Sequence, residues 1–182
     1  MTNTNTPPAG NISAAPHYKA RWLTVCGFLM AMNTVLSSFS IPVPGGHFYL
    51  NDVIIVAAAL SLDPLGAFLV GGVGAFLGDF FFYPLPMFVS LATHGLEAVV
   101  ISLFAQRYGK KNLLLTFFGV FLGALIVVIG YSLGRAYVYS TPEYSLIKLP
   151  FEILQAGIGA ILGAFIWKNR NMGDIIRKII SK

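Results

Sequence analysis

The stretch from Pro64 to Tyr83, which reads PLGAFLVGGVGAFLGDFFFY, constrains the fold of this chain more than any other. It is almost wholly apolar, and an α-helix of about twenty residues covers the roughly 30 Å apolar core of a bilayer. Small residues recur on one side of that helix at spacings of three and four: Ala67, Gly71, Gly74, Ala75 and Gly78. Such a side lets other helix backbones approach closely. The stretch therefore predicts a membrane-spanning helix that packs inside a bundle.

Asp79 is the single charge of this stretch, and it continues the small-residue side near the helix end. An ionisable side chain at membrane depth is costly unless it has a partner or faces a wet cavity. This position is therefore the first indication of a polar site within the bundle.

The composition excludes a soluble domain, because 56% of the 182 residues are hydrophobic and only 10% are charged. The net charge of +5 comes from basic residues scattered between apolar runs, which indicates membrane topology and argues against nucleic-acid binding. The single cysteine, Cys26, cannot form a disulfide framework or a cysteine metal cluster. Walker, HExxH and GxSxG sequences are absent as well. We therefore expect no enzyme activity, no catalytic residues, no metal and no cofactor.

Six apolar segments predict an all-α membrane protein, a six-helix transmembrane bundle that occupies residues 19–168. The second segment is short for a full span, so we expect it to be tilted, kinked or partly interfacial. A polar leader, residues 1–18, is expected to be disordered, and a basic amphipathic tail, residues 169–182, is expected to lie on the inner membrane surface. The segments are Arg21–Ser40, Phe48–Leu62, Pro64–Tyr83, Met87–Gln106, Leu113–Leu133 and Leu146–Lys168.

The basic residues predict the orientation of the bundle in the cell membrane. With both termini cytoplasmic, only Arg135 and Lys148 lie outside, and Trp22 and Trp167 both lie at the inner interface. The remaining basic residues of the chain then lie inside: Lys19, Arg21, Arg107, Lys110, Lys111, Lys168, Arg170, Arg177, Lys178 and Lys182. This asymmetry agrees with the positive-inside rule.

Polar residues gather in the outer half of this predicted bundle. They come from five of the six segments: Asn33, Ser37, Asp79, His94, Glu97, Tyr131, Arg135, Glu152 and Gln155. Because each is costly in hydrocarbon, their shared depth predicts one pocket that opens to the outside. The alternative is that they pair with one another and hold the helices together. For Asp79 and Arg135 we expect this structural role, as neighbours at the outer rim.

The loop from Ile41 to Asp52, IPVPGGHFYLND, is the predicted cover of that pocket. Its prolines keep the chain extended, and Gly45 and Gly46 permit a tight reversal. His47, Tyr49 and Asn51 then lie just outside the pocket, as a lid would require. A solvated loop with an interfacial tyrosine remains the alternative.

The first segment has two distinct faces. Gly27 and Ala31 belong to a stripe of small residues, whereas Asn33 and Ser37 lie about a third of a turn away. One face can therefore meet the pocket while the other contacts a helix. That helix can belong to this chain or to another protein.

Residues 20–168 resemble an S component, the substrate-binding membrane subunit of energy-coupling factor (ECF) vitamin transporters. The resemblance rests on six short helices and on the sequences PVPGGHFYLND, GAFLVGGVGAFLGDF and HGLEAVV. The branch that it resembles is assigned to hydroxymethylpyrimidine and possibly to pyridoxine. It implies a vitamin site in the outer half beneath the first loop, and docking on a T component driven by two ATPase subunits. The family's AxxxA docking pattern corresponds here to Gly27 and Ala31, with a glycine in place of the first alanine.

Two functions remain open at this point. The first is a binding subunit for a small aromatic heterocycle, held by Asn33, His47, Tyr49, Asn51, His94, Glu97, Glu152 and Gln155. The second is a stand-alone carrier in which His94 and Glu97 relay protons. Such a carrier needs ionisable groups through the inner half as well, and the sequence offers none there. The polar set argues equally against a purely structural membrane protein.

Overall fold

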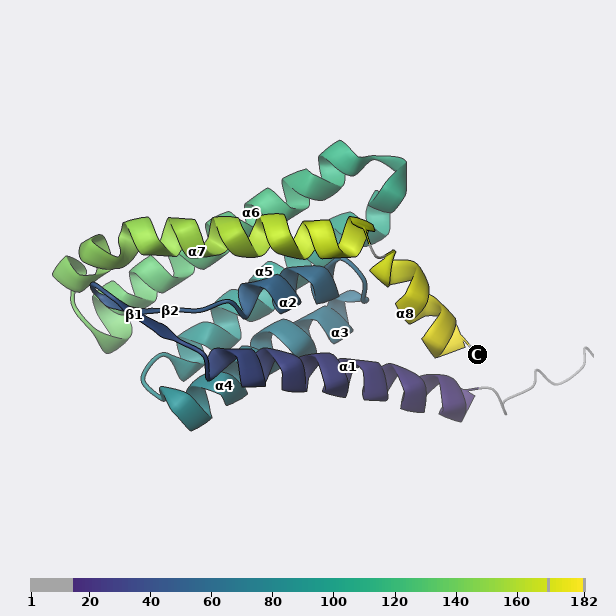
Figure 1. Cartoon of the computed structure of the whole chain (residues 1–182), viewed down its shortest axis with the longest axis horizontal. Helices are drawn as coiled ribbons and strands as arrows, with labels where there is room; N and C mark the ends of the chain where they lie inside the picture. The colour runs from purple at the N-terminus through teal and green to yellow at the C-terminus, as the bar shows by residue number, and fades with distance from the viewer. Residues whose placement is uncertain (1–14, 170, 182) are drawn as a thin grey trace, which may run out of the picture.

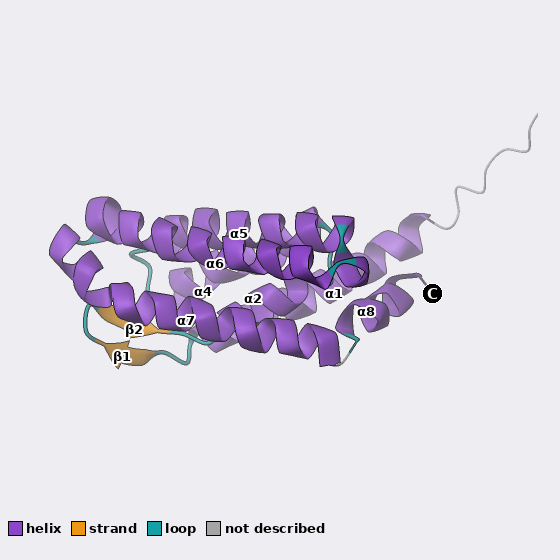
Figure 2. Ribbon diagram, turned by 90° about the horizontal axis from the view of Figure 1, so that it is seen from above, coloured by secondary structure: helices purple, strands orange, loops and turns teal. Residues whose placement is uncertain are grey.

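The computed structural model describes residues 15–169 and 171–181. The long helices run in the same general direction along the bundle, some of them inclined to one another, and a short hairpin covers one end (Figures 1 and 2). The elements in chain order are α1 (Ala15–Ser37), β1 (Ile41–Val43), β2 (Gly46–Phe48), α2 (Asp52–Ala59), α3 (Pro64–Phe68), the π-helix η2 (Leu69–Val73), α4 (Gly74–Phe82), α5 (Met87–Arg107), the 3₁₀ turn η3 (Gly109–Lys111), α6 (Leu113–Gly134), the π-helix η4 (Arg135–Tyr139), α7 (Pro142–Asn169) and α8 (Met172–Ser181).

Four helical stretches of the described chain are long and apolar enough to cross a membrane: Pro64–Phe82, Met87–Arg107, Leu113–Tyr139 and Pro142–Asn169. The prediction of an all-α membrane protein is thus confirmed, but the count of six spans is not. Helix α1 has 23 residues but carries polar groups along its length. Helix α2 has only eight residues, or about 12 Å, which is less than half of the apolar core. The predicted second segment also began too early, because Phe48 belongs to β2.

The two ends of the described chain are helical. Residues 1–14 of the leader lie outside the described residues, and α1 begins at Ala15. Most of the tail forms α8, which contacts α1 and α7. Ile176 and Ile180 are buried there, whereas Ile175 and Ile179 are about half exposed. Helix α8 is therefore amphipathic, with one isoleucine row on the bundle and one facing away from it.

The predicted small-residue side of the third segment is confirmed as a close-packing surface. Ala67, Gly71, Gly74, Ala75 and Gly78 are all buried. A Cβ atom on Gly74 would lie 2.7 Å from the Asn33 Nδ2 atom, and one on Gly78 would lie 2.5 Å from the Ser37 side chain. Only glycine therefore lets α4 approach α1 at these two positions. This contact brings the carboxyl end of α4 to the hairpin end of the bundle.

The apolar core and the polar groups occupy different parts of the bundle. Side chains from α2, α3, α5, α6 and α7 form one buried apolar cluster around Ile55 and Ile101, and α1 and α8 contribute to a second one around Cys26. Many large apolar residues, such as Phe81, Leu114 and Phe165, are instead exposed on the outside of the bundle. An apolar exterior is what lipid contact requires. The buried polar residues lie mainly toward the hairpin end.

Candidate functional site

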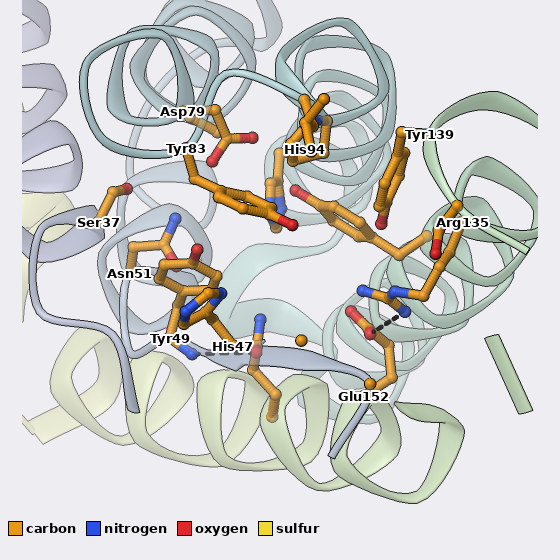
Figure 3. Close-up of a pocket in the computed structure, with 18 residues that line it drawn as sticks. Ser37, His47, Tyr49, Asn51, Asp79, Tyr83, His94, Arg135, Tyr139 and Glu152 are labelled. Carbon is orange, nitrogen blue, oxygen red and sulfur yellow. Dashed lines mark hydrogen bonds and ion pairs between the residues drawn. The ribbon is translucent and has the colours of Figure 1, made fainter. Parts of the chain in front are cut away.

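A cavity of about 210 Å³ lies beneath the hairpin, at the end of the bundle where α4, α6 and η4 end and α7 begins (Figure 3). Side chains from six helices and from the hairpin face it. The lining residues are Ser37, Gly45, Gly46, His47, Tyr49, Asn51, Ala75, Asp79, Tyr83, Leu85, Pro86, His94, Tyr131, Arg135, Tyr139, Ser140, Glu152 and Gln155. The structure thus brings together residues that are more than one hundred positions apart in the sequence.

The hairpin forms the roof of this cavity. Strands β1 and β2 pair in antiparallel register, with Val43 opposite Gly46, so the reversal occurs at Pro44 and Gly45. Gly45 has a φ of +82°, and a Cβ there would lie 2.9 Å from the Lys148 Cβ atom, so this position requires glycine for both conformation and space. The backbone N–H of Tyr49 donates a hydrogen bond to Gln155 Oε1 at 3.1 Å. These contacts hold the hairpin against α7, as a lid on the cavity.

Aromatic rings make up much of the cavity wall. His47 of the hairpin meets Tyr83, the residue after α4, edge-on, with 5.2 Å between ring centroids. His94 of α5 meets Tyr131 of α6 in the same way at 5.3 Å. Figure 3 shows Tyr83, directly after α4, and Tyr139, at the end of η4, facing the same space. Such a wall suits a flat ring, because aromatic pairs prefer edge-to-face and offset-stacked arrangements.

The buried charges on the α6–α7 side form a connected group. Arg135 Nη1 donates to Glu152 Oε2 at 3.0 Å, and Lys148 Nζ lies 3.4 Å from the same oxygen. All three side chains are buried, so pairing offsets part of the cost of removing them from water. Lys148, which the sequence placed at the outer end of the sixth segment as one of the basic residues outside the membrane, is one of the most buried side chains.

Asp79 does not pair with Arg135, contrary to our expectation from the sequence. Its carboxylate accepts a hydrogen bond from Ser90 Oγ, which in turn accepts one from the Tyr131 hydroxyl at 2.5 Å. Arg135 lies across the cavity, where Glu152 is the nearer carboxylate (Figure 3). Both residues line the cavity, so both are available to a ligand. Depth along the membrane normal, which the sequence supplied, does not distinguish residues on opposite walls.

A second buried group lies behind the cavity wall. His94 Nδ1 is 2.8 Å from Glu97 Oε2, and His94 Nε2 is 3.6 Å from Asp52 Oδ1. Gln155 Nε2 donates to Asp52 Oδ2 at 3.1 Å. The cluster has one ligand atom each from Asp52, His94 and Glu97 within 4.8 Å of one another, a spacing that a metal ion could use. However, the imidazole directs one nitrogen toward each carboxylate, which favours a shared proton over ligation of one ion.

Two of the predicted ligand contacts, Asn33 and Glu97, do not line the cavity. Glu97 is behind His94, as described above. Asn33 is fully buried between α1 and the π-helix η2, where its Nδ2 donates to the Val70 carbonyl at 2.7 Å. Its Oδ1 accepts from Asn51 Nδ2 at 3.1 Å. Asn33 therefore connects the base of the lid to the π-helix, while Asn51 itself reaches the cavity.

Three polar atoms of lining residues have no hydrogen-bond partner in the described part of the chain: His47 Nδ1, Asn51 Oδ1 and the Tyr139 hydroxyl. A buried polar group without a partner is costly, and most such groups in proteins are satisfied. These three atoms belong to the hairpin, to the residue before α2 and to η4. They are therefore well placed to hydrogen-bond a ligand from different sides.

Among the residues of the site that sequence reasoning missed are Asp52, Tyr83, Tyr139 and Lys148. The sequence spacing could have placed two of them in the site, because Tyr83 follows Asp79 by four residues and Lys148 precedes Glu152 by four. Residues at this spacing share a helix face, so each should have been placed with its neighbour. Asp52 and Tyr139 carried no comparable signal, because their positions depend on where α2 begins and on the π-helix η4.

Comparison with known families agrees with this architecture. Residues 18–171 match the family model described as ECF-type riboflavin transporter, S component. No curated protein matches the chain. The match covers every membrane-spanning helix, the hairpin and all residues that line the cavity. This chain therefore belongs to the family of ECF-type riboflavin transporter S components, the substrate-binding membrane subunits of ECF importers.

Proposed function

We propose that this protein binds one small nitrogen-containing aromatic ring, of the hydroxymethylpyrimidine or pyridoxine type, for ATP-driven import. The observation that carries the proposal is the cavity itself, which combines an aromatic wall with unpaired polar atoms beneath a hairpin lid. The rings would stack on the substrate. His47, Asn51 and Tyr139 would hydrogen-bond its ring nitrogens and substituents.

The volume of the cavity supports a single-ring substrate. Pockets for drug-sized ligands usually measure about 300–1,000 Å³. The cavity here, at about 210 Å³, lies below that range. A pyrimidine or pyridine with a few small substituents suits such a space better than a three-ring flavin with its sugar-alcohol chain.

Riboflavin is the second candidate, and the description of the matching family model favours it. Binding a flavin here would require a larger cavity. Outward movement of the hairpin is the simplest way to enlarge it, because the strands have only three residues each. The two candidates therefore differ in how far the lid must open.

The charged residues suggest how an amino or hydroxyl group would be recognised. Glu152 and Asp79 line the cavity from opposite walls and can accept hydrogen bonds from ligand donors. Arg135 lies beside Glu152 and can donate to a ligand acceptor. A buried carboxylate that loses such a ligand bond is left with an unsatisfied oxygen, at a cost of about 1–3 kcal/mol.

Membership of the family implies that transport energy comes from a T component with ATPase subunits. We propose that this partner docks on the Gly27 and Ala31 face of α1. Ala31 is exposed, and nothing lies within 4 Å of where a Gly27 Cβ would be. With both termini in the cytoplasm, the cavity would open to the outside, where an import substrate is captured.

The test begins with the molecule that co-purifies with the protein, released by denaturation and identified by mass spectrometry. Calorimetric titration of emptied protein with hydroxymethylpyrimidine, pyridoxine and riboflavin then ranks the three. A single-ring compound should bind most tightly. If riboflavin binds and both single-ring compounds do not, the substrate class proposed first is wrong.

Two matched variants test the cavity itself. Glu152→Gln changes a lining carboxylate, whereas Glu97→Gln changes a buried carboxylate that does not line the cavity. We expect the Glu152 variant to bind about tenfold or more weakly, because a charge-assisted bond is worth about 1.5–3 kcal/mol. The Glu97 variant should bind within a few-fold of the unchanged protein. The reverse order would place the ligand deeper in the bundle.

A further inference from the structure

A second and larger concavity lies at the opposite end of the bundle from the candidate site. It is a groove of about 1,120 Å³, open on one side, between α8, the first turns of α1, the α2–α3 turn and the ends of α5 and α7. Leucine and isoleucine side chains of α1, α3 and α8 form its apolar part. Its polar and aromatic part includes Trp22, Asp63, Arg107, Lys111, Trp167 and Arg177. Nothing in the proposed vitamin site requires such a groove.

The groove lies at the level where hydrocarbon gives way to lipid headgroups. Three candidate spans start or stop beside it, at Pro64, Arg107 and Asn169. Trp22 and Trp167, which are the only tryptophans of the chain, both line it. Indole rings are enriched at this level of a bilayer. Helix α8 lies at the same end of the bundle, where α7 ends (Figure 1).

Some charged residues of the groove have a hydrogen-bond or ion-pair partner, and others do not. Arg177 pairs with Asp174 at 2.5 Å, and the Asp63 carboxylate accepts a hydrogen bond from Trp22 Nε1 at 2.6 Å. Arg107 and Lys111 are exposed, and neither has an ion-pair partner among residues 15–169 and 171–181. Within the described residues, the groove therefore presents two cations without ion-pair partners beside an apolar wall.

We propose that this groove binds an anionic phospholipid, with its phosphate at Arg107 and Lys111 and its acyl chains along the apolar wall. Basic pockets between helices at the bilayer surface bind anionic headgroups in this manner. An apolar wall next to a cationic rim matches the two parts of one lipid molecule. A soluble anion would use only the rim, and an apolar peptide would use only the wall.

The two tryptophans provide a direct readout, because both belong to the groove. The protein is reconstituted in phosphatidylcholine vesicles that contain a small fraction of either dibrominated phosphatidylglycerol or dibrominated phosphatidylcholine. Bromine quenches indole fluorescence only at close range. We expect the anionic lipid to quench much more strongly than the zwitterionic lipid at the same fraction.

A pair of double variants separates this groove from general surface charge. Arg107→Gln with Lys111→Gln removes the two unpaired cations, and Lys168→Gln with Lys178→Gln removes two exposed cations that do not line the groove. The first should lower the preference for the anionic lipid about tenfold or more. The second should leave it nearly unchanged. Thermal melting in detergent checks that both remain folded, and either single groove variant should show a partial loss.

Three results would overturn the proposal. The first is equal quenching by the two brominated lipids in the unchanged protein. The second is the same loss of preference in both double variants, which would mean that surface charge alone attracts the lipid. The third is displacement of the brominated lipid by soluble glycerol phosphate at comparable concentration, because the groove would then be a site for small anions.

Discussion

The two faces of α1 differ in their burial and in what they contact. On one face, Asn33 and Ser37 are buried against two glycines of α4, and Asn33 forms hydrogen bonds with two other segments. On the other, Gly27 has open space above it and Ala31 is exposed. The first face uses its small neighbours to complete this chain, whereas the second leaves a close-contact surface unused. The same residue type, glycine, thus serves internal packing in α4 and remains free for a partner in α1.

The largest effect, on transport, is expected from substitutions on the face of α1 that carries Gly27 and Ala31. Replacing Gly27 and Ala31 with Leu should abolish ATP-dependent uptake in cells that supply the T component and ATPases. Bulky side chains would hold the partner helix away and remove the close backbone contact. Vitamin affinity of the purified variant should stay near normal, because neither residue lines the cavity. Uptake that persists in this variant, or that proceeds without the ATPases, would favour the stand-alone carrier.

A smaller but substantial effect, on stability, is expected where the Asn33 and Ser37 face of α1 packs on α4. Gly78→Val should destabilise the protein by about 3 kcal/mol, because its Cβ alone would meet the Ser37 side chain at 2.5 Å. Thermal melting in detergent measures the loss. Gly27→Val is the matched control and should melt near the unchanged protein, since its Cβ meets nothing within 4 Å. Equal losses in the two variants would mean that helix propensity, rather than packing, decides the outcome.

The hydrogen bonds of Asn33 should contribute somewhat less than the close packing. Asn33→Ala leaves the Val70 carbonyl and the Asn51 amide without their partner, at about 1–3 kcal/mol. Hydrogen exchange should then increase around η2 and the start of α2. Ser38→Ala, at the exposed position directly after this helix, is the control. A variant that loses vitamin affinity but keeps its stability would return Asn33 to the ligand site.

The smallest effect is expected from Ser37→Ala. Ser37 lines the cavity, but its hydroxyl already donates to the Asn33 carbonyl at 3.1 Å. Its loss should therefore change vitamin affinity by no more than about two- to threefold. Calorimetry measures this change. A tenfold loss would show that the hydroxyl turns to the ligand when the cavity is filled.

The sequence predicted much of this arrangement because membrane burial leaves few choices. A carboxylate or amide in an apolar helix must face the protein interior, so depth and helix face together placed His94, Glu152 and Gln155 around one cavity. The turn at the glycines of the first loop followed from their backbone freedom. These inferences needed only the helix period and the cost of burying charge.

The rest depended on features that helix periodicity does not encode. The pairing of Arg135 with Glu152, rather than with Asp79, depends on which helices are neighbours. The burial of Lys148 depends on the hairpin that covers α7. The short length of α2 depends on where β2 ends, because Phe48 was equally compatible with a helix by its hydropathy. Each of these requires the order of helices in space.

The π-helix η2 also determines which residues after it face the vitamin site. A π turn contains about one residue more than an α turn, so the chain beyond it is rotated relative to a regular helix. If the same residues, with none removed, formed a regular α-helix throughout, everything after Val73 would be turned by about 100°. Asp79 and Tyr83 would then leave the cavity wall, and outward-facing phenylalanines of α4 would turn toward it. In this helix the backbone geometry of one turn, and not only the residue types, therefore specifies what the protein can bind.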